Sequence, residues 1–334
     1  MLSMNTNLIV MCGVPGSGKS FASEIWKEKS KNNCKIFSSD KYRELLLGNE
    51  NCQDNNELVF NTMYRDLVEH LKNGYDAILD ATNTTLKSRL KIIDLLKKND
   101  LFNKVNKFCY IVNTPWEECL LRDCHRDRTV GHNVIDKFIK NFQCPQYFEG
   151  WDLITFDYFP ESGDEGHLNS RLNKMKDFNQ ENPHHIYSLG EHCNRVKDYY
   201  ISYDNVRAKA GLLHDIGKLF TKHFDEYSIA HYYNHDNVGA YFITSHLDLL
   251  TTEEERDNAL DIIFYVNYHM RAHKDFRTTK AYKKYSQIFG QMRLDNLIEF
   301  ADADITASGT KDCHDEVMKK IEELKGKNTN GSKN

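Results

Sequence analysis

The sequence predicts an α/β domain built on a parallel sheet, over residues 1–160, followed by an all-helical domain over residues 180–325. In the first part, short runs of β-branched and aromatic residues alternate with helical patterns, which is typical of a parallel sheet wrapped by helices. After the polar, glycine-containing stretch Pro160–Ser170, long helical periodicities dominate. We therefore expect a linker over residues 161–179 and a disordered polar tail over residues 326–334.

The expected strands are five apolar runs separated by helical segments. In chain order they read NLIVMC, CKIFSS, DAILDA, KFCYIV and DLITFDYF. The patterns ASEIWKEKS and LKSRLKIIDLLKK between them predict helices that flank the sheet. In the second part the helical patterns are LGEHCNRVKDYY, VRAKAGLLHD, VGAYFITSHL, ALDIIFYVNYHM and DNLIEFADAD. We recognise no strand pattern among them.

The composition is that of a soluble globular protein long enough for two domains. Of the 334 residues, 40% are apolar and 28% are charged, and a net charge of -5 provides no overall basic field for nucleic acid. The nine cysteines form no CxxC pair, which indicates reduced thiols and a cytoplasmic location. The apolar run LIVMC near the start is too short to cross a bilayer, so we expect no membrane contact.

A glycine-rich loop between the first expected strand and helix fits the pattern GxxxxGK[ST]. Glycines let backbone N–H groups turn inward around phosphates, and the following helix directs its positive end toward them. The residues expected to bind the nucleotide are Gly13, Gly16, Ser17, Gly18, Lys19 and Ser20. Lys19 would neutralise the β- and γ-phosphates of ATP or another NTP, and Ser20 would bind Mg²⁺.

Two carboxylates follow the next expected strands. Asp40, in SSDKYRE, comes after the second strand, and Asp80 ends the third. Because strand ends at one edge of a parallel sheet face the ligand, Asp40 could accept a proton from an attacking hydroxyl, and Arg43 could pair with a phosphate. Without further information, a helix N-cap is the better interpretation of Asp40, and a cap or turn residue is the alternative for Asp80.

Three arginines recur at close to helical spacing after the fourth strand, at Arg122, Arg126 and Arg128. On a mobile segment above the glycine-rich loop they could clamp the triphosphate in the transition state. The alternative is a solvated basic face of a helix, which is common.

Residues 8 to about 157 resemble the polynucleotide 5′-kinase branch of the P-loop phosphotransferases. The elements that carry the resemblance are GVPGSGKS, SSDKYRE, LDATN, TPWEECLLRDCHRDR and CPQYFEGWD, in family order. The resemblance implies that Asp40 is the general base for the 5′-hydroxyl and that Arg43 contacts the scissile or acceptor phosphate. It further implies a helical lid whose Arg122 and Arg126 engage the NTP phosphates. The best-known phage member has its Asp directly before the Thr-Asn pair, where this chain has an alanine.

Histidines crowd the helical part, because eleven of the fifteen lie between His184 and His314. His214 and Asp215 are adjacent within an apolar helical run, and their side chains would point about 100° apart on a regular helix. Burying both requires a polar partner, and a metal ion is the natural candidate. A single histidine on an apolar helix is more often a core or surface residue, but nitrogen and oxygen donors together suit metals that activate water for attack on phosphorus.

Residues 180 to about 310 resemble the HD-domain phosphohydrolases, most specifically in LLHDIGK, HDNVGA and NYHMRAH. The resemblance implies a first metal on His192, His214, Asp215 and a late aspartate, and a second completed by His235 and His269. On a helical wheel, Asp304 lies nearer the inward face than Asp302, so we choose Asp304. One or two ions of Mn, Fe, Ni, Co or Zn are expected, and the resemblance implies a contact of Lys218 with substrate phosphate.

The two resemblances together predict a bifunctional RNA end-healing enzyme. Its kinase domain would phosphorylate 5′-hydroxyl ends, and its HD domain would remove a 2′,3′-cyclic or 3′-phosphate, so that a separate RNA ligase can act. The catalytic residues would be Lys19, Asp40, Arg43, Arg126 and Asp215. The expected partners are RNA ends, with tRNA and DNA ends as further candidates. Known fusions of this kind commonly carry the HD domain first, whereas here it follows the kinase domain.

Two rival functions remain open at this point. One is a small-molecule or nucleoside kinase fused to a nucleotide phosphohydrolase, for which oligonucleotides would not compete with the substrate. The other is a non-catalytic NTP-dependent sensor, which would bind NTP without phosphoryl transfer. The presence of the expected base, lid and metal residues disfavours the sensor.

Overall fold

The computed structural model describes residues 6–50, 52–126, 129–183, 185–271 and 278–309, together with residue 319. The chain divides into two compact units. The first comprises residues 1–139 and 145–159, and the second comprises residues 140–144 and 160–334. Among the described residues, no helix has both the length and the apolar character that a bilayer span requires.

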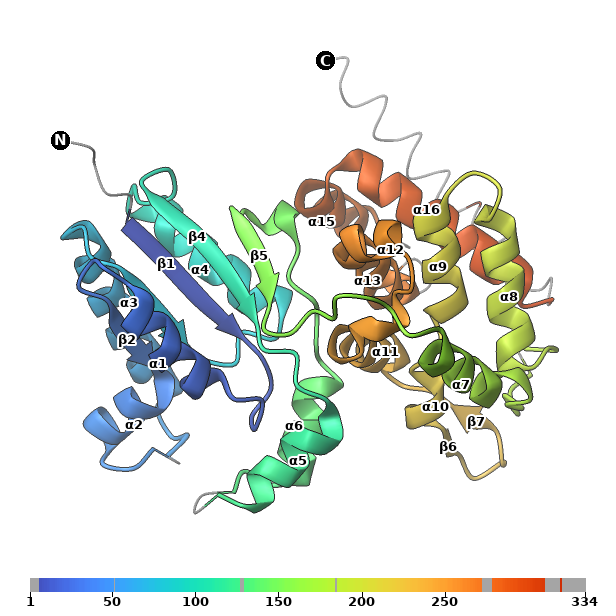
Figure 1. Cartoon of the computed structure of the whole chain (residues 1–334), viewed down its shortest axis with the longest axis horizontal. Coiled ribbons are helices and arrows are strands. Elements are labelled where there is room, and N and C mark those ends of the chain that lie inside the picture. Colours follow the sequence, from blue (N-terminus) through green and yellow to red (C-terminus); the bar gives the residue numbers. More distant parts are fainter. Residues whose placement is uncertain are drawn as a thin grey trace. The chain divides into compact units, whose positions relative to one another are not determined.

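The first unit is built on a parallel five-stranded sheet in the order β2-β3-β1-β4-β5 (Figure 1). The strands are β1 (Thr6–Cys12), β2 (Lys35–Ser38), β3 (Ala77–Asp80), β4 (Val105–Ile111) and β5 (Leu153–Phe156). Each of the five runs predicted from the sequence overlaps one of these strands, so the predicted α/β fold class is confirmed. Leu8 and Val10 of the central strand are fully buried, as expected for a sheet covered by helices.

Helices surround this sheet. They are α1 (Lys19–Lys29), α2 (Ser39–Leu47), α3 (Asn56–Lys72), α4 (Leu86–Lys98), α5 (Trp116–Cys124), α6 (His132–Ile139) and the short 3₁₀ turn η1 (Tyr147–Glu149). On one face of the sheet, Ala22 of α1 packs against Met11 and Ile78, with Trp26 beside them. This packing holds the start of α1 directly above the end of β1.

The strand order brings three chain segments to one edge of the sheet. In the register, Val10 of β1 lies beside Leu79 of β3, and Ser38 of β2 lies beside Asp80. Because all three strands are parallel, the segments that follow them emerge at the same edge. Neighbouring strands therefore end at the glycine-rich loop, at Asp80 and just before Asp40.

A buried ion pair joins α4 to η1 within the first unit. Arg89 is 0% exposed and Glu149 is 2% exposed. The guanidinium donates two hydrogen bonds of 2.7 Å to the two carboxylate oxygens, and Trp151 Nε1 donates a third, 2.9 Å long. Both charged groups are thus paired inside the core, where a lone charge would be costly.

The second unit is helical, which confirms the second half of the predicted fold class. Its helices are α7 (Glu165–Lys176), α8 (Leu189–Tyr200), α9 (Asn205–Leu213), α10 (Lys218–Thr221), α11 (His235–Ser245), α12 (Glu253–Asp257), α13 (Ala259–Tyr268), α15 (Thr279–Phe289), α16 (Gln291–Ala307) and the 3₁₀ turn η2 (Leu247–Leu249). The sequence predicts no strand here, but β6 (His223–Phe224) pairs antiparallel with β7 (Ala230–His231). Two residues per strand are too few to leave an alternating pattern in the sequence.

The boundaries of the second unit differ from those predicted. Residues 161–179 are not a bare linker, because they contain α7, whose Leu168 and Met175 are buried. Residues 140–144, directly after α6, also belong to this unit. There the amide of Asn267 donates 3.1 Å to the carbonyl of Phe142, while its oxygen accepts 2.8 Å from the N–H of Cys144. The tail predicted over residues 326–334 lies outside the described residues.

The buried Arg89–Glu149 pair generates a stability prediction. We expect Arg89→Met to lower the free energy of unfolding by about 3–5 kcal/mol, because it leaves Glu149 charged and unpaired in the core. All three tryptophans of the chain lie in the first unit, so urea unfolding followed by tryptophan fluorescence measures this change. Arg65→Met is the matched control, because Arg65 pairs with Asp66 at the surface, with 73% of its side chain exposed, and should cost less than about 1 kcal/mol. Equal losses in the two variants would contradict the prediction.

Candidate active sites

The glycine-rich loop follows β1 and requires glycine at two positions. Gly16 and Gly18 have φ angles of +81° and +102°, which L side chains rarely adopt. A Cβ on Gly16 would also lie 2.4 Å from the carbonyl oxygen of Cys119 in α5. At the start of the loop, Gly13 donates its N–H to the carbonyl of Thr82, 3.0 Å away. These contacts constrain the conformation of the loop, which leads directly into the first turn of α1.

Two side chains of this loop have polar atoms suited to a phosphate. Lys19 Nζ folds back onto the carbonyl of Val14, 2.8 Å away. Burial lowers the pKa of Lys19, and the negative charge of Asp80 opposes that shift. The Ser17 hydroxyl is buried and has no hydrogen-bond partner among the described residues. An ammonium and an unpaired hydroxyl beside a helix N-terminus fit the negative oxygens of a triphosphate.

Ser20 and Asp80 meet at the end of β3. The Ser20 hydroxyl donates a 2.9 Å hydrogen bond to Oδ2 of Asp80. Burial raises the pKa of this carboxyl, Lys19 opposes the shift, and the charge of Asp40 adds to it. A hydroxyl and a carboxylate on neighbouring segments are oxygen ligands of the kind that Mg²⁺ prefers. Asp80 is therefore better explained as a partner of Ser20 than as a cap or turn residue.

Asp40 lies in the first turn of α2, whose N-cap is Ser38, so Asp40 is not the helix cap. Its Oδ1 accepts a 2.6 Å bond from Nη1 of Arg43, which is itself held by the amide oxygen of Asn56. The carboxylate remains 49% exposed while Arg43 is buried. The geometry therefore presents a charged, oriented and accessible carboxylate beside Asp80.

The two described lid arginines lie near the glycine-rich loop. Arg122 Nη1 donates 3.1 Å to the carbonyl of Ser17, and its Nε bonds Glu118. Arg126 is close enough to Lys19 for its positive charge to lower the pKa of that lysine. Arg128 lies outside the described residues. The arginines are thus not merely a solvated helix face, because Arg122 contacts the loop itself.

The DATN element, residues 80–83, is hydrogen-bonded to the end of β1, just before the glycine-rich loop. Asn83 has a φ of +45°, and its amide donates 2.9 Å to the carbonyl of Met11. Its own carbonyl accepts 3.0 Å from Arg89 Nη1. Sequence reasoning missed this role. An Asn in a short turn after a strand was the available signal, since Asn tolerates positive φ better than most residues.

In the second unit, six side chains converge in the core. Three overlapping groups of three residues could each hold a metal ion, and within each group the ligand atoms lie within 4.8 Å of one another. Their members are His192, His214, Asp215, His235, His269 and Asp304. We call these six residues the HD cluster. They come from α8, the turn after α9, the start of α11, the residue after α13, and α16. All six residues named from the sequence therefore lie together.

Three of the four histidines have a defined tautomer. In His214, His235 and His269, Nδ1 lies 2.7–2.8 Å from the backbone carbonyl of the residue three positions earlier. A carbonyl only accepts, so each of these Nδ1 atoms carries a proton, and in a neutral ring Nε2 then carries the lone pair. Nε2 of His235 lies 3.1 Å from Nε2 of His269, so as neutral rings these two would face each other with lone pairs, which repel unless a proton or a metal ion lies between them. Nε2 of His192 lies 3.2 Å from that of His214, a distance at which one ring can donate a hydrogen bond to the other. The arrangement therefore fits a bound cation.

Asp215 joins the two halves of the cluster. Its Oδ1 lies 3.0 Å from Nε2 of His235, and its Oδ2 lies 3.4 Å from Nε2 of His214. Asp304 completes the second half, with Oδ1 3.0 Å from Nε2 of His192. In the described part of the chain Asp302 belongs to no such group. A carboxylate that uses a different oxygen on each side can bridge two ions.

The local backbone explains how the adjacent His214 and Asp215 both point inward. Helix α9 ends at Leu213, and its C-cap His214 keeps helical backbone angles (φ -56°, ψ -35°), so the pair begins the turn that follows the helix. Gly217 allows this turn to press on α11, because a Cβ there would lie 2.0 Å from the carbonyl oxygen of His235. The glycine of the HDIGK motif is therefore a packing requirement.

The buried carboxylates of the cluster favour positive charge on the groups around them. Burial raises the pKa of Asp215, but Lys218 and His214 outweigh it and hold that pKa well below its usual range. Burial lowers the pKa of His192, but hydrogen bonds with Asp215 and Asp304 outweigh it and raise that pKa to about 9. Two buried carboxylates thus stabilise a cation among the imidazoles, whether a proton or a metal ion.

Lys218 and His185 flank the cluster. Lys218 Nζ contacts Asp215 Oδ2 at 2.7 Å, Gln180 Oε1 at 2.8 Å and His185 Nε2 at 3.2 Å. Burial and the charge of Lys218 lower the pKa of His185 to about 3, so this ring is neutral. The three donors of Lys218 all contact the protein, whereas the resemblance implies a contact with substrate. Sequence reasoning missed His185 and Gln180, which lie in irregular chain without periodicity.

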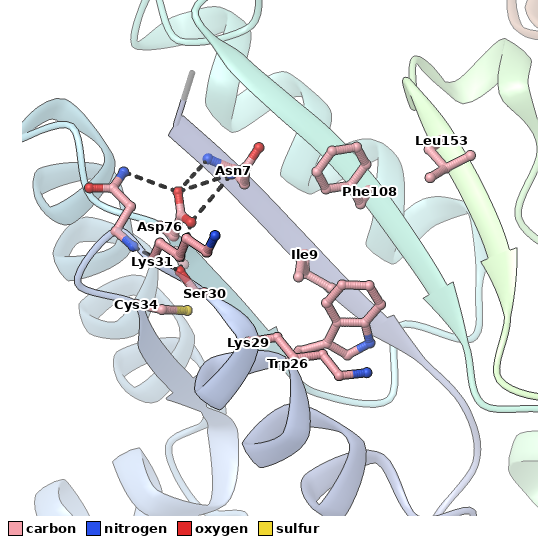
Figure 2. A pocket seen from close by; sticks show the side chains of 12 residues that line it. Asn7, Ile9, Trp26, Lys29, Ser30, Lys31, Cys34, Asp76, Phe108 and Leu153 are labelled. Atoms are coloured by element: carbon pink, nitrogen blue, oxygen red, sulfur yellow. Dashed lines mark hydrogen bonds between the residues drawn. The ribbon is translucent and has the colours of Figure 1, made fainter. Parts of the chain in front are cut away.

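A cavity of about 470 Å³ lies elsewhere in the first unit (Figure 2). Ile9, Trp26 and Phe108 form its apolar wall, and Asp76 lies at its polar end with a 2.9 Å hydrogen bond from the N–H of Asn7. Asp76 precedes β3 and Asn7 is the second residue of β1, so the cavity lies toward the amino ends of the strands. The glycine-rich loop follows their carboxyl ends, and the cavity is therefore separate from it.

Comparison with protein families finds one match in each unit. Residues 8–145 match the model of an AAA domain, and residues 185–308 match the model of an HD domain. The predicted combination of a P-loop domain with an HD domain is thereby confirmed. No curated protein sequence matches the chain.

Solved structures show only limited similarity. A chain of the Pnkp1/Rnl/Hen1 RNA repair complex is 21% identical, with a TM-score of 0.36 over 41% of this chain and 43% of that one. A fungal RNA kinase is 16% identical, with a TM-score of 0.34 over 51% of this chain and 41% of that one. A gluconokinase from Sinorhizobium meliloti 1021 is 14% identical, with a TM-score of 0.33 over 47% and 85%. The match thus spans less than half of the RNA-repair chain.

The cluster geometry generates a prediction about metal binding. We expect Mn²⁺ at 100 times its dissociation constant to stabilise the second unit by about 2.7 kcal/mol, because the ion binds only the folded arrangement. Asp215→Asn should abolish both this stabilisation and the bound metal, measured by thermal unfolding and elemental analysis. Asp198→Asn is the matched control, because that carboxylate lies at the surface. Wild-type metal content in Asp215→Asn would exclude the cluster as the site.

Proposed function

We propose that the chain is a bifunctional RNA end-healing enzyme. The first unit phosphorylates 5′-hydroxyl ends with ATP or another NTP, and the second removes a 2′,3′-cyclic or 3′-phosphate. The observation that carries the proposal is the presence of two phosphate-directed sites on one chain. One is a glycine-rich loop beside an oriented carboxylate, and the other is a buried set of facing imidazoles. A separate RNA ligase would then join the two corrected ends.

In the first unit, Asp40 accepts the proton of the 5′-hydroxyl while the hydroxyl oxygen attacks the γ-phosphorus. The bond from that phosphorus to the bridging oxygen breaks, and the nucleoside diphosphate leaves. Arg43 orients the Asp40 carboxylate through their 2.6 Å contact. Lys19 and Arg126 stabilise the negative charge of the transferring group. Mg²⁺, when held by Ser20 and Asp80, would neutralise charge on the phosphates.

In the second unit, the HD cluster would hold one or two divalent ions of Mn, Fe, Ni, Co or Zn. Such ions supply Lewis acidity, which polarises a phosphoryl oxygen and activates water. The chain's own residues orient the reaction, because three Nδ1–H bonds to backbone carbonyls keep the rings fixed. With a cyclic phosphate, water adds to phosphorus, one ester oxygen leaves with a proton from that water, and a monophosphate remains on the RNA end. Hydrolysis of that monoester by a second water would release inorganic phosphate and leave a hydroxyl.

The two chemistries belong together on a broken RNA. Cleavage that leaves a 2′,3′-cyclic phosphate on one side and a 5′-hydroxyl on the other creates two ends that cannot be ligated. One needs a phosphate added and the other needs its phosphate altered or removed. An enzyme with both sites corrects both ends of the same break, which explains why one polypeptide carries them.

The kinase assignment is tested with Asp40→Asn. We expect transfer from labelled ATP to a 5′-hydroxyl RNA to fall by roughly 10²–10⁴-fold, because the variant has no carboxylate to take the proton. ATP affinity should stay within about 3-fold of wild type, since Asp40 acts on the acceptor. Asp100→Asn, at an exposed turn, is the control. Unchanged transfer by Asp40→Asn would remove Asp40 as the base.

The acceptor in that assay separates the proposal from its rivals. Phosphorylation of nucleosides without competition by oligonucleotides would favour a small-molecule kinase. Binding of NTP without transfer to RNA, DNA or nucleosides would favour a sensor. Both outcomes would contradict the first half of the proposal.

The hydrolase assignment is tested with His214→Ala. We expect opening of a 2′,3′-cyclic phosphate RNA, assayed with Mn²⁺, Co²⁺ or Ni²⁺, to fall by roughly 100-fold or more, because a metal contributes several kcal/mol to such a reaction. The 5′-kinase activity of the same preparation should be unchanged. His223→Ala, which alters an exposed histidine, should leave both activities at wild-type levels. Full cyclic-phosphate activity in His214→Ala would show that the reaction occurs elsewhere.

A further inference from the structure

His185 lies beside the HD cluster, and the proposed reaction assigns it no role. Its ring packs edge to face on that of His192, with centroids 5.3 Å apart. Its Nε2 lies 3.2 Å from Nζ of Lys218, which in turn contacts Asp215. His185 precedes α8 and belongs to none of the metal-type groups found in the described residues. It is therefore adjacent to the cluster without being one of its six members.

The contact with Lys218 determines which nitrogen of His185 carries the proton. An ammonium has donors and no acceptor, so Nε2 of His185 must be the acceptor of this hydrogen bond. The ring then carries its proton on Nδ1. That Nδ1 is buried and has no hydrogen-bond partner among the described residues. A buried donor without an acceptor is unfavourable, and a bound ligand with a free oxygen would satisfy it.

Lys218 is less suited than His185 to donate a hydrogen bond to a bound phosphate. Its ammonium has three N–H groups, and three acceptors surround it, in Asp215, Gln180 and His185. A phosphate contact from Lys218 would require it to give up one of these partners. His185, by contrast, offers a donor that no described group of the protein uses.

We propose that His185 is a further catalytic residue of the second site, whose Nδ1–H donates a hydrogen bond to an oxygen of the bound phosphoryl group. Lys218 is then a positioning residue, which holds the His185 ring through Nε2 and the Asp215 carboxylate through Oδ2. This inference rests on the proposed function insofar as the cluster acts on a phosphate ester. Because His185 is a neutral donor, it fixes the orientation of the phosphoryl group without adding charge.

Two amide substitutions separate the nitrogens of the ring. The side-chain nitrogen of His185→Asn can replace Nδ1, whereas the amide of His185→Gln reaches the position of Nε2 and leaves the Nδ1 position empty. In full-length protein loaded with Mn²⁺, we expect His185→Gln to weaken binding of inorganic phosphate, measured by calorimetry, by roughly 10-fold. His185→Asn should remain within about 3-fold of wild type, because it keeps the donor. Metal content should be unchanged in both variants.

The same pair is then compared for opening of a 2′,3′-cyclic phosphate RNA, where kcat/KM should follow the same order. Wild-type phosphate binding in His185→Gln, or an equal loss in both variants, would overturn the inference, since the ring would then serve only to hold Lys218. Loss of metal from both variants would overturn it as well. If the wild type opens no cyclic phosphate but phosphate binding keeps the expected order, the proposed substrate is wrong and the role of His185 stands.

Discussion

The second unit depends on one electrostatic constraint, which is the burial of four imidazoles and two carboxylates in a common volume. Nε2 atoms 3.1 Å and 3.2 Å apart repel if both carry bare lone pairs, so each pair requires a proton or a metal ion between its members. Helices α8, α11 and α16 each carry one member, and the turns after α9 and α13 carry the others. The packing of these helices therefore requires a proton or a metal ion within the cluster, so the fold and the chemistry of the unit depend on the same six residues.

Both sites include residues at which regular elements begin or end. The glycine-rich loop lies between β1 and α1, and Asp215 lies in the turn after α9, so neither belongs to the body of an element. At such positions some backbone groups lack partners within the element. Close contacts then stabilise the turns, as between Gly217 and the carbonyl of His235. Packing supplies the rigidity that the missing regular hydrogen bonds do not.

The sequence predicts features that have a period or a spacing. Five alternating apolar runs revealed the sheet, and a helical wheel favoured Asp304, which lies in the cluster, over Asp302. Features set by contacts between distant segments left no local signal. Residues 140–144 join the second unit because Asn267, more than 120 positions away, bonds Phe142 and Cys144. His185 lies in irregular chain, and its relation to Lys218 arises only when the fold brings them together.

The two sites draw on separate parts of the chain. Thr82, Cys119 and Arg122, which contact the glycine-rich loop, belong to the first unit, and every member of the HD cluster belongs to the second. Substitutions at sites with no shared partners have nearly additive effects. A variant of Asp40 and a variant of His214 therefore probe different reactions in one molecule, and a loss of both activities from one substitution would indicate damage to the fold. Each site thus provides an internal control for the other.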